Sequence, residues 1–282
     1  ILLGPPVLMG CLAVVENLRA GELGRVRNLC GGRLPTALGR SVANAFWSLW
    51  LTALALPFGR GQQPHPKPCV APPVILVHGL YHNPAAWFVF RKRLAAAGFG
   101  DARAYAYSSF GPSFAQIVSE LAQLIRETAA SSRPLTPHPS GGRVLLVGHS
   151  LGGLIIRAAC AEAGVAEAVA GVVTLGAPHR GSTLAGLLAL GALGRGLAPA
   201  GTVVSQVRAL PVCRARALSL HIPTDAMVLP YSGSLLDQRE KDAGWMEACL
   251  GPMSHVGLLY NKKAAAMATA FLRDCSRDVG RG

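Results

Sequence analysis

Residues 144–159 have the sequence VLLVGHSLGGLIIRAA. The first four form a continuous apolar run, which is typical of a strand buried on both faces. A second apolar stretch, from Leu151 to about residue 163, suits a helix that packs back onto that strand. The two are joined by Gly148-His149-Ser150-Leu151-Gly152, a Gly-x-Ser-x-Gly pattern. This stretch predicts a strand, a tight turn and a helix, with Ser150 at the turn.

The tight turn explains why both flanking positions are glycines. A sharp elbow crowds the backbone on either side of the serine, and Gly148 and Gly152 have no side chain to collide. Ser150 would stand at the amino end of a helix, where free N–H groups and the helix dipole stabilise a negative oxygen. A phosphate-binding turn would need Gly-x-Gly-x-x-Gly or a lysine after the glycines, which this stretch lacks. The pattern favours Ser150 as a nucleophile, with a serine that only caps the helix as the alternative.

Strand and helix signals alternate on both sides of this stretch. Short apolar runs predict further strands, and amphipathic or capped segments predict the helices between them. This alternation is typical of an α/β fold whose mostly parallel sheet is covered on both faces. The predicted strands are 74–77, 102–107, 144–147, 172–175, 217–222 and 245–250, and the predicted helices are 87–97, 113–130, 151–163 and 261–273.

Three motifs carry a resemblance to a known family. They are VILVHGLYHNPAAW at 74–87, VLLVGHSLGGLIIRAA at 144–159 and VVTLGAPHRGS at 172–182. They resemble the bacterial lipases and esterases of the α/β-hydrolase family, over about residues 72–275. The resemblance implies an α/β-hydrolase fold for residues 74–275 and a Ser–Asp–His triad in that order along the chain. It also implies hydrolysis of carboxylic esters, lipid acyl esters above all, through an acyl-enzyme.

The base and its orienting carboxylate are sought later in the chain. A serine hydroxyl needs a neutral imidazole to accept its proton near neutral pH. His255, in GPMSHVGLL, follows the last predicted strand and matches the catalytic-histidine loop of the family. Asp225, in HIPTDAMVLP, follows the strand 217–222 and precedes this histidine, so we predict it as the orienting carboxylate. The competing carboxylates lie in a charged loop, where solvation is their expected role: Asp237, Glu240 and Asp242.

The oxyanion hole of this fold takes two backbone N–H groups. One belongs to the residue after the nucleophile, Leu151, and the other to Leu80, which follows the turn at His78-Gly79. Other side chains are expected to line the acyl entrance (Tyr81 and His82) or to pack within the fold (His149, His179 and His221).

Neither a cofactor nor a metal ion is expected. The seven cysteines show no Cys/His spacing of the zinc type. Some relatives bind calcium beside the catalytic histidine, but VGLLYNKK offers no carboxylate after His255. Some relatives also hold this region with a disulfide, which makes Cys213 with Cys249 one candidate pair, and Cys69 with Cys275 another.

Residues 181–211 follow the strand 172–175 and are rich in Leu, Ala and Gly. They fall where this fold inserts its caps. We predict that they form a small, mobile apolar lid over the acyl site, which opens at a lipid surface. The alternative is a pair of core helices.

Residues 1–59 form an N-terminal hydrophobic region that is expected to be helical, and the Pro-rich residues 60–73 form a linker. Residues 41–59 carry no charge and would extend about 28 Å as a helix, which makes a marginal membrane span. A helix packed on the catalytic domain and the apolar region of a signal peptide are the alternatives. Arginines ahead of this segment favour export of the residues after it. We therefore predict a membrane anchor with a periplasmic or extracellular catalytic domain, or a protein secreted after signal cleavage.

The composition of the 282 residues excludes other classes of protein. With 51% hydrophobic and 15% charged residues, the chain does not resemble a disordered one. The net charge is +13, but the basic residues are scattered, so no nucleic-acid partner is expected. The expected partners are a lipid or small ester substrate and a membrane surface. The predicted function is that of a serine ester hydrolase. An acyltransferase with the same acyl-enzyme, or a membrane-anchored non-catalytic protein of this fold, is the alternative.

Overall fold

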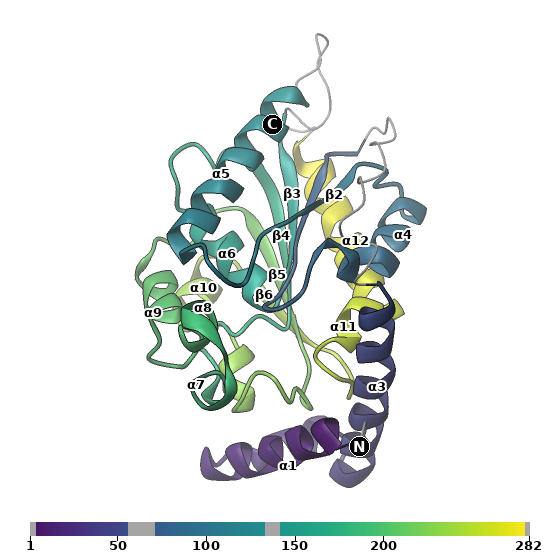
Figure 1. The fold of residues 1–282 in the computed structure, drawn as a ribbon. Helices are drawn as coiled ribbons and strands as arrows, with labels where there is room; N and C mark the ends of the chain where they lie inside the picture. Colours follow the sequence, from purple (N-terminus) through teal and green to yellow (C-terminus); the bar gives the residue numbers. More distant parts are fainter. Residues whose placement is uncertain (1–3, 56–70, 133–141, 280–282) are drawn as a thin grey trace.

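The computed structural model describes residues 4–55, 71–132 and 142–279. Its centre is a six-stranded sheet with the strand order β2-β1-β3-β4-β5-β6, in which every neighbouring pair is parallel. Figure 1 shows helices on both faces of this sheet. The strands are β1 (Val74–Val77), β2 (Ala102–Tyr105), β3 (Val144–His149), β4 (Val169–Leu175), β5 (Arg216–His221) and β6 (Met246–Cys249).

The central strands supply two hydrophobic clusters at once. β1 and β3 are buried along their whole length. Because successive side chains of a strand point to opposite faces, Ile75 and Leu146 join one cluster, and Leu76 and Val147 join the other. Continuous apolar runs, and not alternating ones, therefore encode these strands.

Two helical layers complete the clusters and confirm the predicted doubly covered α/β sheet. Local sequence signals fix where these helices begin. At the start of the helix Phe114–Ser131 (α5), Ser113 Oγ accepts a hydrogen bond from Gln116 N at 3.1 Å and so caps the helix. One layer contains α5 (Phe114–Ser131), α6 (Leu151–Ala159) and α9 (Thr202–Ala209), and the other contains α4 (Phe88–Ala96), α11 (Gly257–Tyr260) and α12 (Lys262–Val279). The shorter elements are η2 (Pro84–Trp87), α7 (Thr183–Leu188), α8 (Gly191–Arg195), η3 (Tyr231–Ser234) and α10 (Gln238–Asp242).

The predicted lid, residues 181–211, folds as α7, α8 and α9. Leu193 of α8 and Val204 of α9 are buried in the same cluster as α6, as the alternative of core helices expects. The large apolar side chains that stay exposed in this segment are Leu187, Leu188 and Leu190. The lid therefore stays a prediction for residues 187–190 and not for the whole segment.

The N-terminal region forms α1 (Gly4–Arg19), α2 (Leu23–Leu29) and α3 (Leu34–Ala55), as predicted for a helical region. Figure 1 shows α3 along the side of the molecule that carries α11 and α4. Residues 41–55 of the segment proposed as a membrane span thus form a helix packed on the catalytic domain, while 56–59, and 60–70 of the linker, lie outside the described residues. In the part of the chain that the structure describes, no helix is both long and apolar enough to cross a membrane.

The candidate disulfide between Cys213 and Cys249 is not formed in this structure. Both are free thiols, and Cys213 hydrogen-bonds to Cys160. Cys249 pairs in register with His221, the last residue of β5, whereas Cys213 precedes the first residue of that strand. Five residues of strand separate these levels by about 16 Å, and a disulfide needs Cα atoms closer than about 7 Å. The partner proposed for Cys275, at position 69, lies outside the described residues.

Candidate active site

Ser150 lies at the turn between β3 and α6, where the sequence predicts it. Its backbone has φ 55° and ψ −125°, a region that residues other than glycine rarely adopt. Its N–H donates to Leu175 O at 2.9 Å, which ties the turn to the end of β4. A non-glycine residue held in such a conformation is typical of functional turns, where the surrounding structure maintains the strain.

Glycines surround this turn because backbone atoms occupy the space of a side chain. A Cβ on Gly148 would lie 2.6 Å from Gly153 N, and one on Gly152 would lie 2.1 Å from Val77 O. Gly153 is a third position without room for a side chain, here because of a neighbouring side chain: its Cβ would lie 2.6 Å from Ala177 Cβ. The sequence analysis did not single out this glycine. The doubled glycine after Ser150-Leu151 is the signal that could have indicated it.

Asp225 and His255 form a buried hydrogen-bonded pair, as expected from the sequence. His255 Nδ1 lies 2.7 Å from Asp225 Oδ2. The other oxygen, Oδ1, accepts from Met227 N at 2.8 Å and from Val228 N at 3.0 Å. Because its own loop holds Oδ1, the carboxylate has a fixed orientation. When Nδ1 donates to this carboxylate, Nε2 is the ring nitrogen that can accept a proton.

The competing carboxylates have other partners. Asp237 forms an ion pair with Arg180 at 2.9 Å, and Asp242 bonds to a side chain one turn before it. Glu240 was expected to be solvated, which is wrong: it is 1% exposed and lies 2.5 Å from Arg157 of α6. The buried guanidinium of Arg157 attracts the carboxylate into the interior.

His149 connects the turn at Ser150 to His255. Its Nε2 lies 3.2 Å from His255 O, and the two rings are 4.7 Å apart. Next to Leu175, Gly176 leaves room for the base, because a Cβ there would lie 3.1 Å from His255 Nδ1. The turn, the end of β4 and the His255 loop therefore meet at the carboxyl edge of the sheet. Burial and the nearby His255 lower the pKa of His149 well below its usual range, so this ring is neutral.

The residues predicted to supply the oxyanion hole, Leu151 and Leu80, lie directly after Ser150 and directly after a glycine that packs against Ser150. Leu151 is the first residue of α6, so its N–H has no acceptor within the helix. Gly79, which precedes Leu80, lies against the serine, because a Cβ there would be 2.9 Å from Ser150 Cβ. The loop is held by Tyr107, whose hydroxyl donates to His78 O at 2.8 Å. The sequence analysis missed this tyrosine, although it ends the predicted strand 102–107.

Tyr81 and His82 follow this loop. The Tyr81 hydroxyl donates to Leu190 O at 2.7 Å, and its ring stacks on Phe110 at 5.5 Å. The His82 ring lies 5.7 Å from that of His149. Burial lowers the pKa values of His78 and His82 to about 4, so both rings are neutral near pH 7. Tyr81, Phe110 and Leu190 are exposed and form an apolar rim beside the candidate site.

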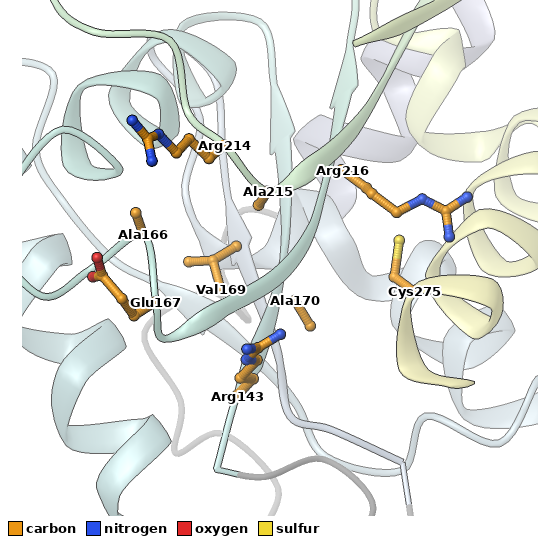
Figure 2. Close-up of a pocket in the computed structure, with 9 residues that line it drawn as sticks. All are labelled: Arg143, Ala166, Glu167, Val169, Ala170, Arg214, Ala215, Arg216 and Cys275. Atoms are coloured by element: carbon orange, nitrogen blue, oxygen red, sulfur yellow. The ribbon is translucent and has the colours of Figure 1, made fainter. Parts of the chain in front are cut away.

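The other end of the sheet, away from Ser150, is hollowed. The structure has a pocket of about 420 Å³ at the amino ends of β3, β4 and β5. Figure 2 shows that the guanidinium groups of Arg143, Arg214 and Arg216 point to different sides of this pocket, so they do not converge on one anion. Among residues 4–55, 71–132 and 142–279, no group of three or more His, Cys, Asp or Glu side chains is placed to hold a metal ion.

Comparison with known proteins identifies the family. The sequence model described as "Alpha/beta hydrolase family" matches residues 74–275, which is more than half of the chain. The chain belongs to the alpha/beta hydrolase family. The match leaves α1, α2 and α3 of this alpha/beta hydrolase outside the family's region.

Solved structures share the fold of this alpha/beta hydrolase. Mature lipase BlEst2 of Bacillus licheniformis is 22% identical with a TM-score of 0.51, over 76% of this chain and 96% of that one. Lipase B of Aspergillus fumigatus is 18% identical with a TM-score of 0.54, over 72% and 52%. The monoacylglycerol lipase of Paleococcus ferrophilus is 17% identical with a TM-score of 0.51, over 73% and 96%. At these identities the likeness shows the fold alone, and no curated protein matches the chain.

Proposed function

We propose that this alpha/beta hydrolase cleaves carboxylic esters with Ser150 as nucleophile, His255 as general base and Asp225 as its orienting carboxylate. The observation that carries the proposal is the 2.7 Å contact between His255 Nδ1 and Asp225 Oδ2, beside a serine held at φ 55°. A histidine fixed by a buried carboxylate next to a strained serine is the arrangement that serine hydrolases use on several unrelated folds.

The reaction follows from this arrangement. Ser150 Oγ attacks the ester carbonyl while His255 Nε2 takes the hydroxyl proton. The N–H groups of Leu80 and Leu151 donate to the oxygen that becomes negative. His255 returns the proton to the leaving alcohol, and an acyl-enzyme forms on Ser150. Water then attacks the acyl-enzyme, with the same histidine as base, and releases the acid and the free serine.

The apolar rim supports lipid acyl esters as the substrates. Tyr81, Phe110 and Leu190 are exposed next to the loop of Leu80, and the exposed side chains of Leu187 and Leu188 continue the rim along α7. An acyl chain gains by covering such surface as it enters. Residues 187–190 are the part of the predicted lid that this proposal keeps.

We further propose that the N-terminal helices meet a lipid surface. The face of α3 turned away from the protein is apolar: Trp47 is 66% exposed and Leu54 is 64% exposed. Residues 4–55, which contain these helices, carry five arginines against two glutamates, and this excess of positive charge suits anionic headgroups. Tryptophan is favoured at the level of lipid headgroups. This proposal places the catalytic domain at a membrane surface, and its location outside the cytoplasm stays a prediction.

Ser150→Ala tests the catalytic proposal. We expect hydrolysis of a short p-nitrophenyl ester to fall by several orders of magnitude, together with loss of labelling by a fluorophosphonate. Ser205→Ala, a change at an exposed serine of α9, is the matched control and should keep both. Ser150→Ala with near wild-type activity would refute the assignment. Product analysis with added alcohol separates hydrolysis from acyl transfer, and a wild-type protein that neither labels nor turns over supports the non-catalytic alternative.

Sedimentation with vesicles of phosphatidylcholine and phosphatidylglycerol tests the surface proposal. We expect the double change of Trp47 and Leu54 to serine to lower vesicle binding several-fold, while turnover of a soluble ester stays the same. Met246→Ser removes an exposed apolar side chain from β6 and is the control. Equal vesicle binding by the double variant and the wild type would rule the surface out.

A further inference from the structure

Helix α3 turns a stripe of polar side chains toward the catalytic domain. Its polar members recur at the spacing of one helical face, at Ser41, Asn44, Ser48 and Thr52. Each has a hydrogen bond to a residue beyond position 220. This arrangement is the reverse of an ordinary surface helix, whose apolar side faces the core. The stripe lies outside residues 74–275, the part that the family's sequence model matches.

Ser41 joins the loop of the carboxylate to the loop of the base. The Ser41 hydroxyl is buried and lies 2.9 Å from Met253 O and 3.2 Å from Thr224 O. Thr224 directly precedes Asp225, and Met253 lies two residues before His255. The loops also bond to each other, because Thr224 Oγ1 donates to Met253 O at 3.0 Å. Ser41 Oγ, Thr224 and Met253 O therefore contact one another just before Asp225 and His255 in the chain.

Asn44 holds the residue next to the base. Its Oδ1 accepts from Ser254 N at 2.9 Å and from Ser254 Oγ at 2.8 Å. Ser254 Oγ in turn accepts from Gly257 N at 3.0 Å, which closes the turn around His255. Gly257 has no space for a side chain, because a Cβ there would lie 1.9 Å from Asn44 Oδ1. The turn from Ser254 to Gly257 therefore packs closely around Asn44 Oδ1.

We propose that Asn44, supported by Ser41, is a positioning residue that sets the geometry between His255 and Asp225. The inference rests on the proposed function of that pair. Without the acceptor oxygen, the N–H of Ser254 loses its partner, and the Ser254 hydroxyl keeps only the weaker contact with Ser48 Oγ at 3.2 Å as an acceptor. The turn that carries His255 then loses its fixed position. A displacement of about 1 Å at a reacting group costs as much as about 10²-fold in rate. The N-terminal helices then complete the active site as well as covering the domain.

The competing explanation is that the polar stripe only attaches α3 to the catalytic domain. A change at Thr52 distinguishes this explanation from a positioning role of Asn44. Thr52 belongs to the same stripe and lies 2.8 Å from the hydroxyl of Tyr260, so it also attaches α3 to the domain. Tyr260 ends α11 and lies outside the turn around His255. If α3 only adds stability, loss of either bond has the same consequence. If Asn44 positions the base, only its loss changes catalysis.

The experiment compares Asn44→Ala, Asn44→Asp and Thr52→Ala in the full chain. With a soluble short-chain ester, we expect Asn44→Ala to lower kcat about 30- to 100-fold with KM within about three-fold of wild type. Asn44→Asp keeps an acceptor oxygen and is expected to recover kcat to within about five-fold. Thr52→Ala is expected to keep kcat within about three-fold, even where its Tm falls as far as that of Asn44→Ala.

A proton NMR spectrum of each variant gives a readout that does not depend on turnover. The His255 Nδ1 proton bonded to Asp225 should give a downfield resonance, assigned by its absence in Asp225→Ala. We expect it in the wild type, Asn44→Asp and Thr52→Ala, and expect it shifted or broadened in Asn44→Ala. Unchanged kcat and resonance in Asn44→Ala would overturn the inference, as would equal kcat losses in Asn44→Ala and Thr52→Ala. Wild-type protein without esterase activity refutes the proposed function, and the resonance then still decides whether Asn44 positions the pair.

Discussion

Gly152→Ala is expected to remove most of the activity by moving Ser150 and Leu151. The new Cβ would lie 2.1 Å from Val77 O and 2.7 Å from His78 O. These are backbone atoms at the end of a central, fully buried strand, so they cannot rotate away. Restoring an ordinary contact requires the start of α6 to move by about 1 Å, which costs about 1–3 kcal/mol in a packed interior.

That displacement acts directly on the chemistry. A 1 Å misplacement costs as much as about 10²-fold in rate, and loss of one oxyanion donor costs about 10²–10³-fold. We therefore expect kcat/KM for a soluble ester to fall by about 10²–10³-fold. Gly79→Ala should lose less, because its Cβ would lie 2.9 Å from the nearest atom, Ser150 Cβ, which is a smaller overlap than the 2.1 Å at Gly152.

The assay combines steady-state kinetics, circular dichroism and titration of active serine with a fluorophosphonate, so that loss of fold is separated from loss of rate. Gly39→Ala is the control: its Cβ would have no neighbour within 4 Å, and it lies on the exposed side of α3. Alanine there should stabilise the helix by up to about 1 kcal/mol with unchanged activity. A folded Gly152→Ala protein with kcat/KM within about three-fold of wild type would refute the reasoning.

Buried groups give three further predictions. Asp225→Asn should lower kcat about 10⁴-fold at similar KM in steady-state kinetics, because an amide does not hold His255 in the same tautomer; wild-type kcat would argue against this role. Glu240→Ala leaves the Arg157 guanidinium buried without its carboxylate and should lower the free energy of unfolding by about 3–5 kcal/mol in urea titrations; an unchanged midpoint would contradict it. His78 and His82 have folded-state pKa values lowered to about 4 from 6.5, so the unfolded chain binds more protons between these values. The urea midpoint should therefore fall as pH drops from 6.5 to 4, and a flat profile would count against their burial as neutral rings.

The parts of the site that the sequence predicts are those encoded by local pattern. The strand, the turn and the helix around Ser150 occupy one continuous stretch of sequence. The two glycines at the turn are required because backbone atoms, a few residues away or at the end of the adjoining strand, leave no room for a side chain. The chain order that the family resemblance implies, together with the predicted strand ends, then selects Asp225 and His255, which the structure brings to 2.7 Å. The parallel, doubly covered sheet follows from the same apolar runs.

The expectations that the structure does not bear out, the solvated Glu240 and the candidate disulfide, concern partners that are distant in sequence. Glu240 stands in a charged stretch, and nothing nearby indicates that Arg157, 83 residues earlier, draws it into the interior. Cys213 and Cys249 bracket Asp225 in the sequence, but β5 carries the chain from one end of the sheet to the other between them. Composition and spacing describe neighbours along the chain, whereas pairing across the sheet depends on strand order and register.

Helix α3 shows most clearly why the hydrophobic pattern alone was insufficient. Residues 41–55 lack charge and are mostly apolar, which suits a lipid environment as well as a packed helix. The polar stripe is visible in the sequence, but the usual rule would turn it toward solvent. The structure turns it inward, because backbone groups of the His255 and Asp225 loops lack partners within a strand or helix and Asn44 and Ser41 supply them. The apolar side is left facing outward, so one physical cause accounts both for the support of the base and for the exposed Trp47 and Leu54 that we propose meet lipid.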